Sequence, residues 1–361
     1  MVPIGEICEL FNGRAFKPED WQNADSGGIP IVRIQNLNNP DSSFNYYTGE
    51  VNERNTINNG ELLFSWSGSR GTSFGAHIWK GQKAVLNQHI FKVGFDESRA
   101  TKIYLLHALN KAVVEVEENL HGGVGLVHIT KGNLERIQIP MPPLEVQKDI
   151  VAEIEGYQKV INGARAVLDH YRPHIPIHPD WPMVPLGECV DILDSKRRPI
   201  TKSDRKPGPY PYFGATGVLD YVEGYLFDEP LVLVGEDGAK WEAHDNTAFA
   251  ISGKTWVNNH AHVLRPMRTK LLDLFLITAL NEMDLSRHIT GVTVPKLNRE
   301  KLRDIRVPLP PRATQQAIVS EIEAEQALVA ANRELITRFE QKIQVTLARI
   351  WGEAAPATRE T

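Results

Sequence analysis

The second half of the chain contains a segment that is dense in positive charge and could contact an anionic polymer. Within eleven positions it holds six basic residues and one acidic residue, Asp204. The basic residues are Lys196, Arg197, Arg198, Lys202, Arg205 and Lys206. Further aromatic, hydroxyl and basic side chains follow at Tyr212, Thr216, Lys240 and Trp241. Lysine and arginine bind phosphate, and arginine also pairs with guanine, so the pattern favours a nucleic-acid surface over a merely solvated loop.

The first half has its own candidates for contacts with bases. Arginine pairs with guanine, and asparagine or glutamine pairs with adenine, through two hydrogen bonds in the major groove. Residues of these types, together with serines and a lysine, occur in stretches that we expect to be loops or strand ends. The candidates are Arg14, Lys17, Arg33, Gln35, Asn36, Ser67, Ser69 and Arg70.

No recognisable catalytic motif accompanies these residues. The sequence has neither an Asn/Asp-Pro-Pro-Tyr/Phe motif for a flipped base nor a Gly-x-Gly loop in a βαβ setting. A nuclease centre could be assembled from Asp191, Asp194, Asp204 and Lys206, but such acidic and lysine spacings are common by chance. We therefore expect no catalytic residue and no cofactor in this chain.

Metal binding is not expected either. The two cysteines, Cys8 and Cys189, are far apart, which is typical of a reduced protein and provides no metal framework. The evenly spaced histidines His170, His174 and His178 are interrupted by prolines, so they cannot share one helical face.

The composition bounds the class of protein. With 361 residues, 42% apolar and 24% charged, the chain can form two globular domains. No apolar run is long enough for a membrane span, and residues 1–11 lack the basic-then-apolar pattern of a signal peptide, so we expect a cytoplasmic protein. The net charge of −5 means that any grip on phosphate must come from local clusters or from a partner.

The chain repeats itself, which suggests two similar domains with different targets. Three pairs of segments match in the same order: 2–6 with 184–188, 85–89 with 256–260, and 134–155 with 302–323. The shared residues are therefore expected to be structural, including Asn87, His89, Asn258 and His260, and the differing loops are expected to contact the target.

Each half ends in a pattern that predicts a long helix with a coiled-coil seam. Apolar residues recur at alternating steps of three and four after each Pro-Pro pair, which is the spacing of a seam for a partner helix. The seam residues that we expect to pack together are Ile154, Tyr157, Ile161, Leu168, Ile322, Val329, Ile336, Phe339 and Ile343. Glu325 and Asn332 also occupy seam positions, where polar residues can fix register. The two helices most simply pair with each other.

The rest of each half alternates short strands with turns and contains one clear helix, near 100–119 and 270–282. We expect an α+β fold with two mixed-sheet domains and two long antiparallel coiled-coil helices. The expected boundaries are 1–143 for the first domain, 144–171 for the first long helix, 172–182 for a proline-rich connector, 183–311 for the second domain, 312–351 for the second long helix and 352–361 for a flexible tail.

This order of elements resembles the specificity subunits of type I restriction-modification enzymes. The turns 139–147 and 307–315 are similar to the family's entry into each conserved helix. Landmarks of its recognition domains resemble the segments 86–89, 122–125, 212–217 and 234–239.

The resemblance implies a non-catalytic subunit that binds double-stranded DNA. Each recognition domain would read one half of a bipartite target, and the helices would set the unread spacer. Two modification subunits, which methylate adenine with S-adenosylmethionine, and restriction or translocase subunits would be its partners. The alternative from another class is a coiled-coil adaptor that does not bind DNA.

Overall fold

The computed structural model describes all residues except 40–41, 69–73, 120–126, 292 and 353–361. The chain forms two compact units: unit 1 comprises Met1–Ala164 with Leu335–Thr361, and unit 2 comprises Arg165–Glu334. No helix in the described part of the chain is both long enough and apolar enough to cross a membrane.

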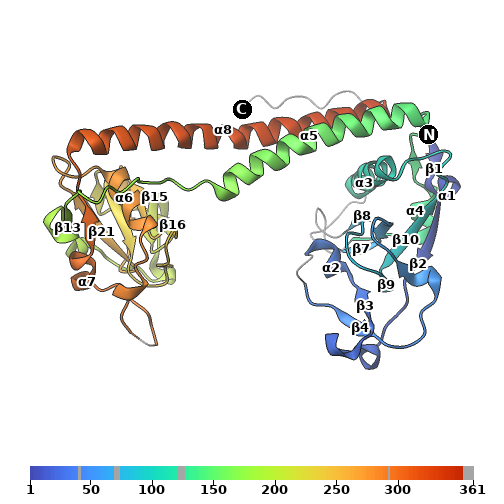
Figure 1. The fold of residues 1–361 in the computed structure, drawn as a ribbon, viewed down its shortest axis with the longest axis horizontal. Coiled ribbons are helices and arrows are strands. Elements are labelled where there is room, and N and C mark those ends of the chain that lie inside the picture. The colour runs from blue at the N-terminus through green and yellow to red at the C-terminus, as the bar shows by residue number, and fades with distance from the viewer. Residues whose placement is uncertain (40–41, 69–73, 120–126, 292, 353–361) are drawn as a thin grey trace. The chain divides into compact units, whose positions relative to one another are not determined.

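Unit 1 is built on an antiparallel sheet with apolar side chains on both faces. Its strands, in order, are β2 (Cys8–Asn12), β10 (Ile90–Phe95), β6 (Leu62–Ser65) and β8 (Gly75–Ile78). Leu62 and Phe64 pack into the core beneath helix α3 (Lys102–Asn119), whereas Leu63 faces the opposite side. This alternation follows from the two-residue period of a strand, and α3 covers one face of the sheet (Figure 1).

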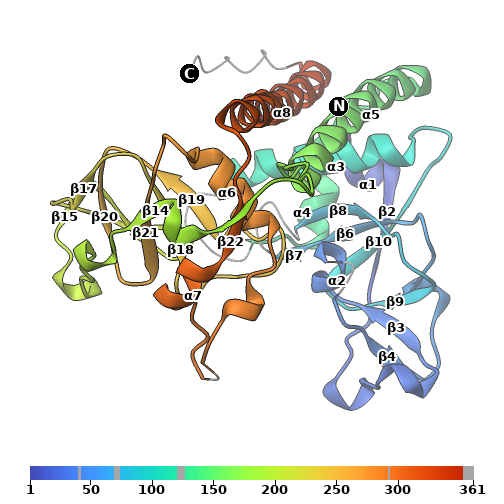
Figure 2. The same ribbon diagram turned by 60° about the vertical axis from the view of Figure 1, so that its left-hand side comes forward.

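A smaller sheet lies on the other face. It consists of β4 (Asn45–Tyr47), β3 (Ile29–Val32), β9 (Ala84–Leu86) and β5 (Thr56–Ile57), with β3 and β9 parallel. Val32, Ile57 and Leu86 of this sheet form a second core with Leu63. In Figure 2 this sheet lies beyond the larger sheet, away from α3.

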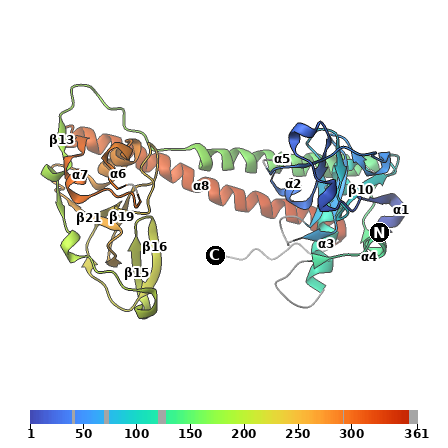
Figure 3. The same ribbon diagram turned by 90° about the horizontal axis from the view of Figure 1, so that it is seen from below.

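Unit 2 repeats this plan. The larger sheet is β14 (Val190–Ile192), β21 (Ala261–Pro266), β18 (Leu231–Gly235) and β19 (Ala248–Ile251), and helix α6 (Asp273–Glu282) packs on it. The smaller sheet is β16 (Gly217–Val222), β15 (Pro207–Gly214), β20 (Lys254–Val257) and β17 (Phe227–Asp228), and β15 with β16 forms the long hairpin of Figure 3. Val232 and Val234 face α6, and Leu231 and Leu233 face the smaller sheet.

Short elements complete both units. In unit 1 they are β1 (Val2–Pro3), α1 (Ile4–Ile7), η1 (Pro18–Asp20), η2 (Ala24–Ser26), α2 (Ile34–Asn38), η3 (Glu53–Asn55), β7 (Ser67–Gly68), β11 (Val127–His128), α4 (Lys131–Arg136) and β12 (Gln138–Ile139). In unit 2 they are β13 (Met183–Pro185), η4 (Leu186–Glu188), η5 (Asp194–Lys196), η6 (Lys202–Asp204), η7 (Ser286–His288), α7 (Arg299–Asp304) and β22 (Arg306–Pro308). The first strand of each unit pairs with its last, β1 with β12 and β13 with β22.

Buried amides hold the same place in both units. Gln147 accepts from the backbone N–H of Thr101 and donates to two carbonyls, and Gln315 does the same with Leu272 and two carbonyls. Asn110 exchanges two hydrogen bonds with the backbone of Ala76, and Asn281 does so with Ala248. The duplication in sequence is therefore a duplication in structure.

The two long helices are α5 (Leu144–His170) and α8 (Arg312–Trp351), and each contributes residues to both units. In unit 1 they run antiparallel, because Glu153 contacts Arg349 (2.8 Å) whereas Tyr157 contacts Phe339, whose ring centroid is 5.5 Å away (Figure 1). In unit 2 the Tyr171 hydroxyl, just after α5, donates to Glu325 (2.9 Å).

The predicted α+β class with two sheet-containing domains and long helices is confirmed. Two local features differ from these expectations. Helix α6 begins at Asp273 and not at residue 270, and the β15–β16 hairpin was not predicted as strand. Five residues of β15 are glycine or proline, which strand propensity disfavours, so its pairing with β16 and β20 decides this element.

Candidate nucleic-acid interface

In unit 1, several loops meet where strands β3, β6 and β9 end, and backbone hydrogen bonds fix them to one another. These bonds run from Arg14 N–H to Leu86 C=O (2.9 Å), from Asn87 N–H to Val32 C=O (3.0 Å), from Trp66 N–H to His89 C=O (3.2 Å) and from Ile129 N–H to Trp66 C=O (3.1 Å). We call residues 13–17, 33–36, 66–67 and 87–89 the first loop cluster.

Unit 2 has the same set of bonds at the ends of β15, β18 and β20. They run from Arg198 N–H to Val257 C=O (3.2 Å), from Asn258 N–H to Phe213 C=O (3.0 Å), from Glu236 N–H to His260 C=O (2.8 Å) and from Leu297 N–H to Glu236 C=O (2.8 Å). We call residues 196–198, 214–216, 236–241, 258–260 and the described part of 290–297 the second loop cluster.

Because each bond has a counterpart, positions in the two clusters can be equated one by one. Arg14 corresponds to Arg198, and Gln35 corresponds to Thr216, since each lies three residues after a bonded carbonyl. All four side chains are exposed. The structure therefore brings predicted contact residues of both halves to the same place on a repeated framework.

Arg14 is held in a defined direction. Its Nη1 donates to the Tyr47 hydroxyl (2.7 Å), and the guanidinium lies 4.7 Å from the centroid of the Tyr47 ring and 5.4 Å from that of Phe16. Gly13 makes the approach possible, because a Cβ at this position would lie 2.1 Å from the Asn87 carbonyl oxygen. Stacking on a ring limits the rotation of a guanidinium, which suits directional hydrogen bonding.

The second cluster exposes more cations. Lys196, Arg198 and Lys240 are exposed at its loops. Trp241 is only partly exposed, and its Nε1–H donates to the Gly235 carbonyl (3.1 Å), so its ring supports the loop that carries Lys240.

Three predicted contact residues are buried and are corrected to structural roles. Asn36 is 3% exposed, and its amide bonds to Arg33 N–H and to the carbonyls of residues 42 and 43. Ser67 is 4% exposed and Tyr212 is 1% exposed, with the Tyr212 hydroxyl accepting from Ile200 N–H (3.0 Å). No surface is left on these side chains for a base. Ser69 and Arg70 lie outside the described residues.

Arg197 is also a structural residue. Its guanidinium lies 2.7 Å from Glu236 and 3.4 Å from Asp194, and it donates to the Ala261 carbonyl (2.8 Å). Both ring nitrogens of the buried His262 face oxygens, those of Asp194 (2.7 Å) and the Leu297 carbonyl (2.6 Å). The Arg197 side chain is only 13% exposed and is held by these contacts, so it cannot reach DNA without breaking them.

Asp194, Glu236 and His262 have ligand atoms within 4.8 Å of one another, as in a metal site. The Arg197 guanidinium already contacts both carboxylates, so the arrangement fits an ion-pair network better than a cation site. Burial opposes ionisation of Asp194, but hydrogen bonds from His262 and Val263 and the charge of Arg197 outweigh it, and the pKa of Asp194 is lowered.

The remaining predicted residues lie on or beside the smaller sheets. Arg205 lies over the Tyr212 ring (4.6 Å to the centroid) and pairs with Asp220 (3.3 Å). Lys206 is 4.0 Å from Glu223, and Lys202 is exposed. In unit 1, Lys17 is 3.8 Å from Glu19, and the Arg33 guanidinium lies 5.7 Å from the centroid of the Trp21 ring.

Sequence reasoning missed two residues of the second cluster, Asp237 and Lys296, whose side chains pair at 2.9 Å. The available signal was the repeat: Lys296 precedes Leu302 by the same interval that separates His128 from Leu134. The prediction relied on residues shared by both halves, whereas Lys296 lies at a position where the two halves differ.

The predicted helix-pairing residues lie mostly on inward faces of α5 and α8. Ile154, Ile161 and Ile322 are buried, whereas Leu168, Val329, Ile336, Phe339 and Ile343 are half-buried. Burial opposes ionisation of Glu153, but hydrogen bonds from Arg349, Thr346 and Tyr157 outweigh it, and the pKa of Glu153 is lowered.

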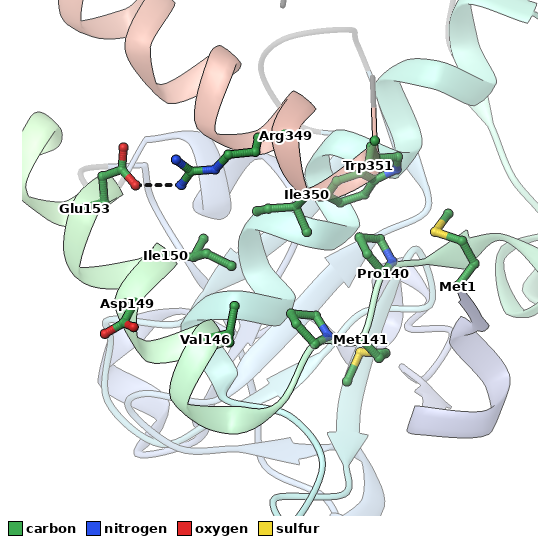
Figure 4. A pocket seen from close by; sticks show the side chains of 12 residues that line it. Met1, Pro140, Met141, Val146, Asp149, Ile150, Glu153, Arg349, Ile350 and Trp351 are labelled. Atoms are coloured by element: carbon green, nitrogen blue, oxygen red, sulfur yellow. Dashed lines mark hydrogen bonds and ion pairs between the residues drawn. The ribbon is translucent and has the colours of Figure 1, made fainter. Parts of the chain in front are cut away.

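A cavity of about 650 Å³ lies in unit 1 where α5 begins and α8 ends (Figure 4). Met1, Met141, Val146 and Ile150 give it an apolar lining, and Trp351 closes one side. The ion pair of Glu153 with Arg349 lies at its rim (Figure 4). Met1 and Val146 are exposed, so the lining is open to an apolar side chain from outside.

Comparison with known proteins gives a consistent picture. The family model of the type I restriction modification DNA specificity domain matches residues 1–166 and 179–341. A putative type I restriction enzyme specificity subunit of Haemophilus influenzae is 37% identical over 146 residues, which are 40% of this chain and 37% of that protein. The type I restriction enzyme EcoBI specificity subunit of Escherichia coli is 26% identical over 168 residues, 46% of this chain and 34% of that protein. The matched segments thus span little more than a third of either relative.

The fold is similar to that of a solved structure described as the structural basis of complex assembly and conformational transition of the type I R-M system. The TM-score is 0.61 at 18% sequence identity, and the match covers 97% of this chain and 96% of that one. The family model matches most of both halves of the chain, and the repeated framework runs through the same residues. The chain therefore belongs to the family of type I restriction-modification specificity subunits.

Proposed function

We propose that this chain is the sequence-specific DNA-recognition subunit of a type I restriction-modification complex. The supporting observation is the pair of loop clusters, which share a backbone framework and expose different side chains. Such a design allows two half-sites of different sequence to be read by one fold, because the framework positions each cluster and the exposed residues discriminate bases. The first cluster reads one half of a bipartite target, and the second cluster reads the other.

Helices α5 and α8 set the unread spacer between the half-sites. A helix rises 1.5 Å per residue, so the number of residues in α5 and α8 determines a length that can be expressed in base pairs of DNA. We call this the ruler. The antiparallel contact of Tyr157 with Phe339 and the bond of Tyr171 to Glu325 fix the register of the two helices.

The partners of this subunit are two modification subunits, which supply S-adenosylmethionine chemistry on adenine, and restriction or translocase subunits. The chain itself recognises and does not catalyse. The apolar cavity at the start of α5 and end of α8 supports docking of a helix from a modification subunit, because a third helix would cover Val146 and Ile150.

The first experiment is DNA binding by the chain together with its modification subunits. The motif is first identified by methylome sequencing of the native genome, and a duplex carrying it is then compared with random duplexes. We expect binding that falls steeply with salt and is stronger for the motif. Absence of DNA binding in the assembled complex would instead support the coiled-coil adaptor.

The ruler is tested by removing one heptad from each long helix. Seven residues correspond to about 10 Å of helix, which is about three base pairs of duplex at about 3.4 Å each. We expect the methylated motif to keep both half-sites and to lose about three base pairs of spacer. Removal of a heptad from α8 alone is the matched control and should abolish modification, since the seam residues no longer meet. An unchanged spacer in the double deletion would refute the ruler.

A further inference from the structure

The second loop cluster contains a carboxylate that holds two basic side chains at once. The two oxygens of Asp237 contact the Nδ1 of His260 and the Nζ of Lys296, the latter at 2.9 Å. Asp237 is nearly buried at 8% exposure, whereas the side chains of His260 and Lys296 are 50% and 38% exposed. The carboxylate is therefore anchored inside the loop cluster, and the two groups it holds reach the surface.

Backbone hydrogen bonds hold the described residues beneath this arrangement. Thr290 and Lys296 exchange two backbone hydrogen bonds of 2.8 Å, and Leu297 N–H donates to the Glu236 carbonyl (2.8 Å). Gly291 has φ +91°, a conformation open to glycine, which lets the hairpin close on itself. The backbone of Lys296 is therefore held in place by hydrogen bonds.

The donors that remain point away from the carboxylate. His260 uses its Nδ1 on Asp237, and the Nε2 of a neutral imidazole that donates through Nδ1 is an acceptor, so the role of this ring is to hold the carboxylate and the free donors are those of Lys296. An ammonium has three N–H groups, and one of those on Lys296 is given to Asp237. The hydrogen bonds from Lys296 and His260 outweigh the burial of Asp237 and lower its pKa, so the carboxylate remains charged and keeps hold of both groups.

A carboxylate beside a lysine is a poor device for gripping phosphate. It neutralises part of the charge that would attract the backbone, and in exchange it fixes the direction of the ammonium. Phosphate contacts tolerate variable geometry, whereas reading a base requires donors aimed at particular atoms. Guanine is the base that presents two adjacent acceptors, N7 and O6, in the major groove.

The equivalent place in unit 1 carries different chemistry. Ser67 pairs with His128 across the strands, as Asp237 bridges to Lys296. The histidine position is shared, as His89 and His260, but serine cannot neutralise and orient a cation as aspartate does. The difference falls where two half-sites of different sequence would require it.

We infer that Asp237 is a positioning residue that aims the Lys296 ammonium at the N7 and O6 atoms of one guanine in the half-site read by unit 2. This inference rests on the proposed function and adds the residues and the base that they discriminate. Lys296 is the specificity-determining residue, Asp237 acts only through it, and His260 holds the other oxygen of Asp237.

The test uses the full chain in complex with its modification subunits and the duplex that carries the methylated motif. Each guanine of the half-site assigned to unit 2 is replaced in turn by 7-deazaguanine, which lacks the N7 acceptor and still pairs with cytosine. For the wild-type chain we expect one replacement to weaken binding about 10-fold or more. For Lys296→Ala, the same replacement should have no further effect, whereas binding to the half-site read by unit 1 should be unchanged.

Two further variants distinguish the effect of orienting the Lys296 ammonium from the effect of positive charge in the cluster. Lys240→Ala, which removes an exposed cation of the same cluster, should weaken binding to all duplexes by the same factor and keep the 7-deazaguanine effect. Asp237→Asn should reduce discrimination at that guanine while random duplexes bind as well as before or better, since a negative charge is lost.

The outcomes are distinct. Failure of the wild-type complex to prefer the motif over random duplexes would overturn the proposed function itself. With the motif preferred, the inference is overturned if no guanine of that half-site responds to 7-deazaguanine, or if Lys296→Ala weakens all duplexes equally, as a phosphate contact would.

Discussion

In unit 1 the loop after strand β2 is fixed by a backbone group, and in unit 2 the same loop is fixed by a charged side chain. Gly13 N–H donates to the Ile90 carbonyl (3.1 Å), whereas the guanidinium of Arg197 donates to the equivalent Ala261 carbonyl (2.8 Å). At the end of the first strand of this sheet, unit 1 has Asn12, which is exposed. At the equivalent position unit 2 has Asp194, which contacts Arg197. One framework is thus supported in two ways.

This comparison teaches that the backbone arrangement is more general than the residues beneath it. The four bonds that tie the loops together recur in both clusters, and the amides of Gln147 and Gln315 recur with the same partners. The support below the second cluster is ionic, and buried ion pairs are costly to break because the remaining charge is left uncompensated. Unit 2 should therefore be more sensitive than unit 1 to loss of charge.

The largest effect is expected from Asp194→Ala. This change leaves Arg197 and His262 without their carboxylate, and breaking a buried pair costs about 3–5 kcal/mol of the free energy of unfolding. The matched control is Asn12→Ala at the equivalent, exposed position of unit 1, which should cost far less. Urea unfolding of the two variants measures the difference. Equal losses would contradict the comparison.

The effect of Asp194 also has a pH dependence. Its pKa is lowered in the folded chain, so its contribution is present above the unfolded value of about 3.9 and is lost as the pH falls through the folded pKa. The gap in stability between wild type and Asp194→Ala should be full at pH 7 and should narrow below about pH 4. A gap that stays constant in acid would show that the carboxylate does not act as a charge.

A somewhat smaller and equal effect is expected for Gln147→Ala and Gln315→Ala. Each glutamine satisfies one N–H and two carbonyls at the start of a long helix, and unsatisfied buried groups cost about 1–3 kcal/mol each before relaxation. We expect about 2–4 kcal/mol for either variant by urea unfolding. Gln316→Ala, an exposed neighbour, should be nearly neutral. Clearly unequal losses for the two glutamines would break the equivalence of the units.

Much of the fold could be predicted from the sequence because its determinants are local or periodic. The three-and-four spacing of Ile154, Tyr157 and Ile161 indicates a helix with one apolar face, and Pro142-Pro143 fixes where α5 begins. The internal repeat can be recognised from the sequence alone. The β15–β16 hairpin was not predicted because its prolines and glycines disfavour strands, and its pairing with β20 at Tyr212 and Phe213 lies far away in the sequence.

The candidate site was less predictable, for a physical reason. Residue type tells what a side chain could bind but not whether it is exposed. Asn36, Arg197 and Arg198 look equally suitable in sequence, yet Asn36 closes a turn, Arg197 joins a buried network and Arg198 is exposed. Likewise, Asp237 and Lys296 are 59 positions apart, and their pairing exists only through the fold.

The variants Arg14→Ala and Arg198→Ala test whether the two loop clusters read different half-sites. These residues are equivalent on the framework, and an arginine that reads a base contributes about 1–3 kcal/mol of discrimination. We expect each variant to weaken binding to duplexes through one half-site only, and a different one in each case. Gel shifts with duplexes in which one half-site is scrambled measure this. Identical behaviour of the two variants on all duplexes would mean that both contact phosphate.

The smallest effect concerns the pair of long helices. In unit 1, Tyr157 lies opposite Phe339. The repeat places Glu325 and Tyr171 at the equivalent positions in unit 2. Burial, followed by the hydrogen bond to Glu325, raises the pKa of Tyr171 to about 12. The Tyr171 hydroxyl joins the residue that follows α5 to helix α8, whereas the Tyr157 hydroxyl bonds to Glu153 on its own helix.

We therefore expect Tyr171→Phe to lower the free energy of unfolding by about 0.5 kcal/mol, the low end for a hydrogen bond that solvent partly screens, and Tyr157→Phe to have a smaller effect. Because a raised pKa favours the protonated hydroxyl in the folded chain, this contribution is present below about pH 10 and is lost as the pH rises through about 12. The deficit of Tyr171→Phe, measured by urea unfolding, should shrink over that interval. A deficit that grows with pH would mean that the phenolate, and not the phenol, is the form that holds Glu325.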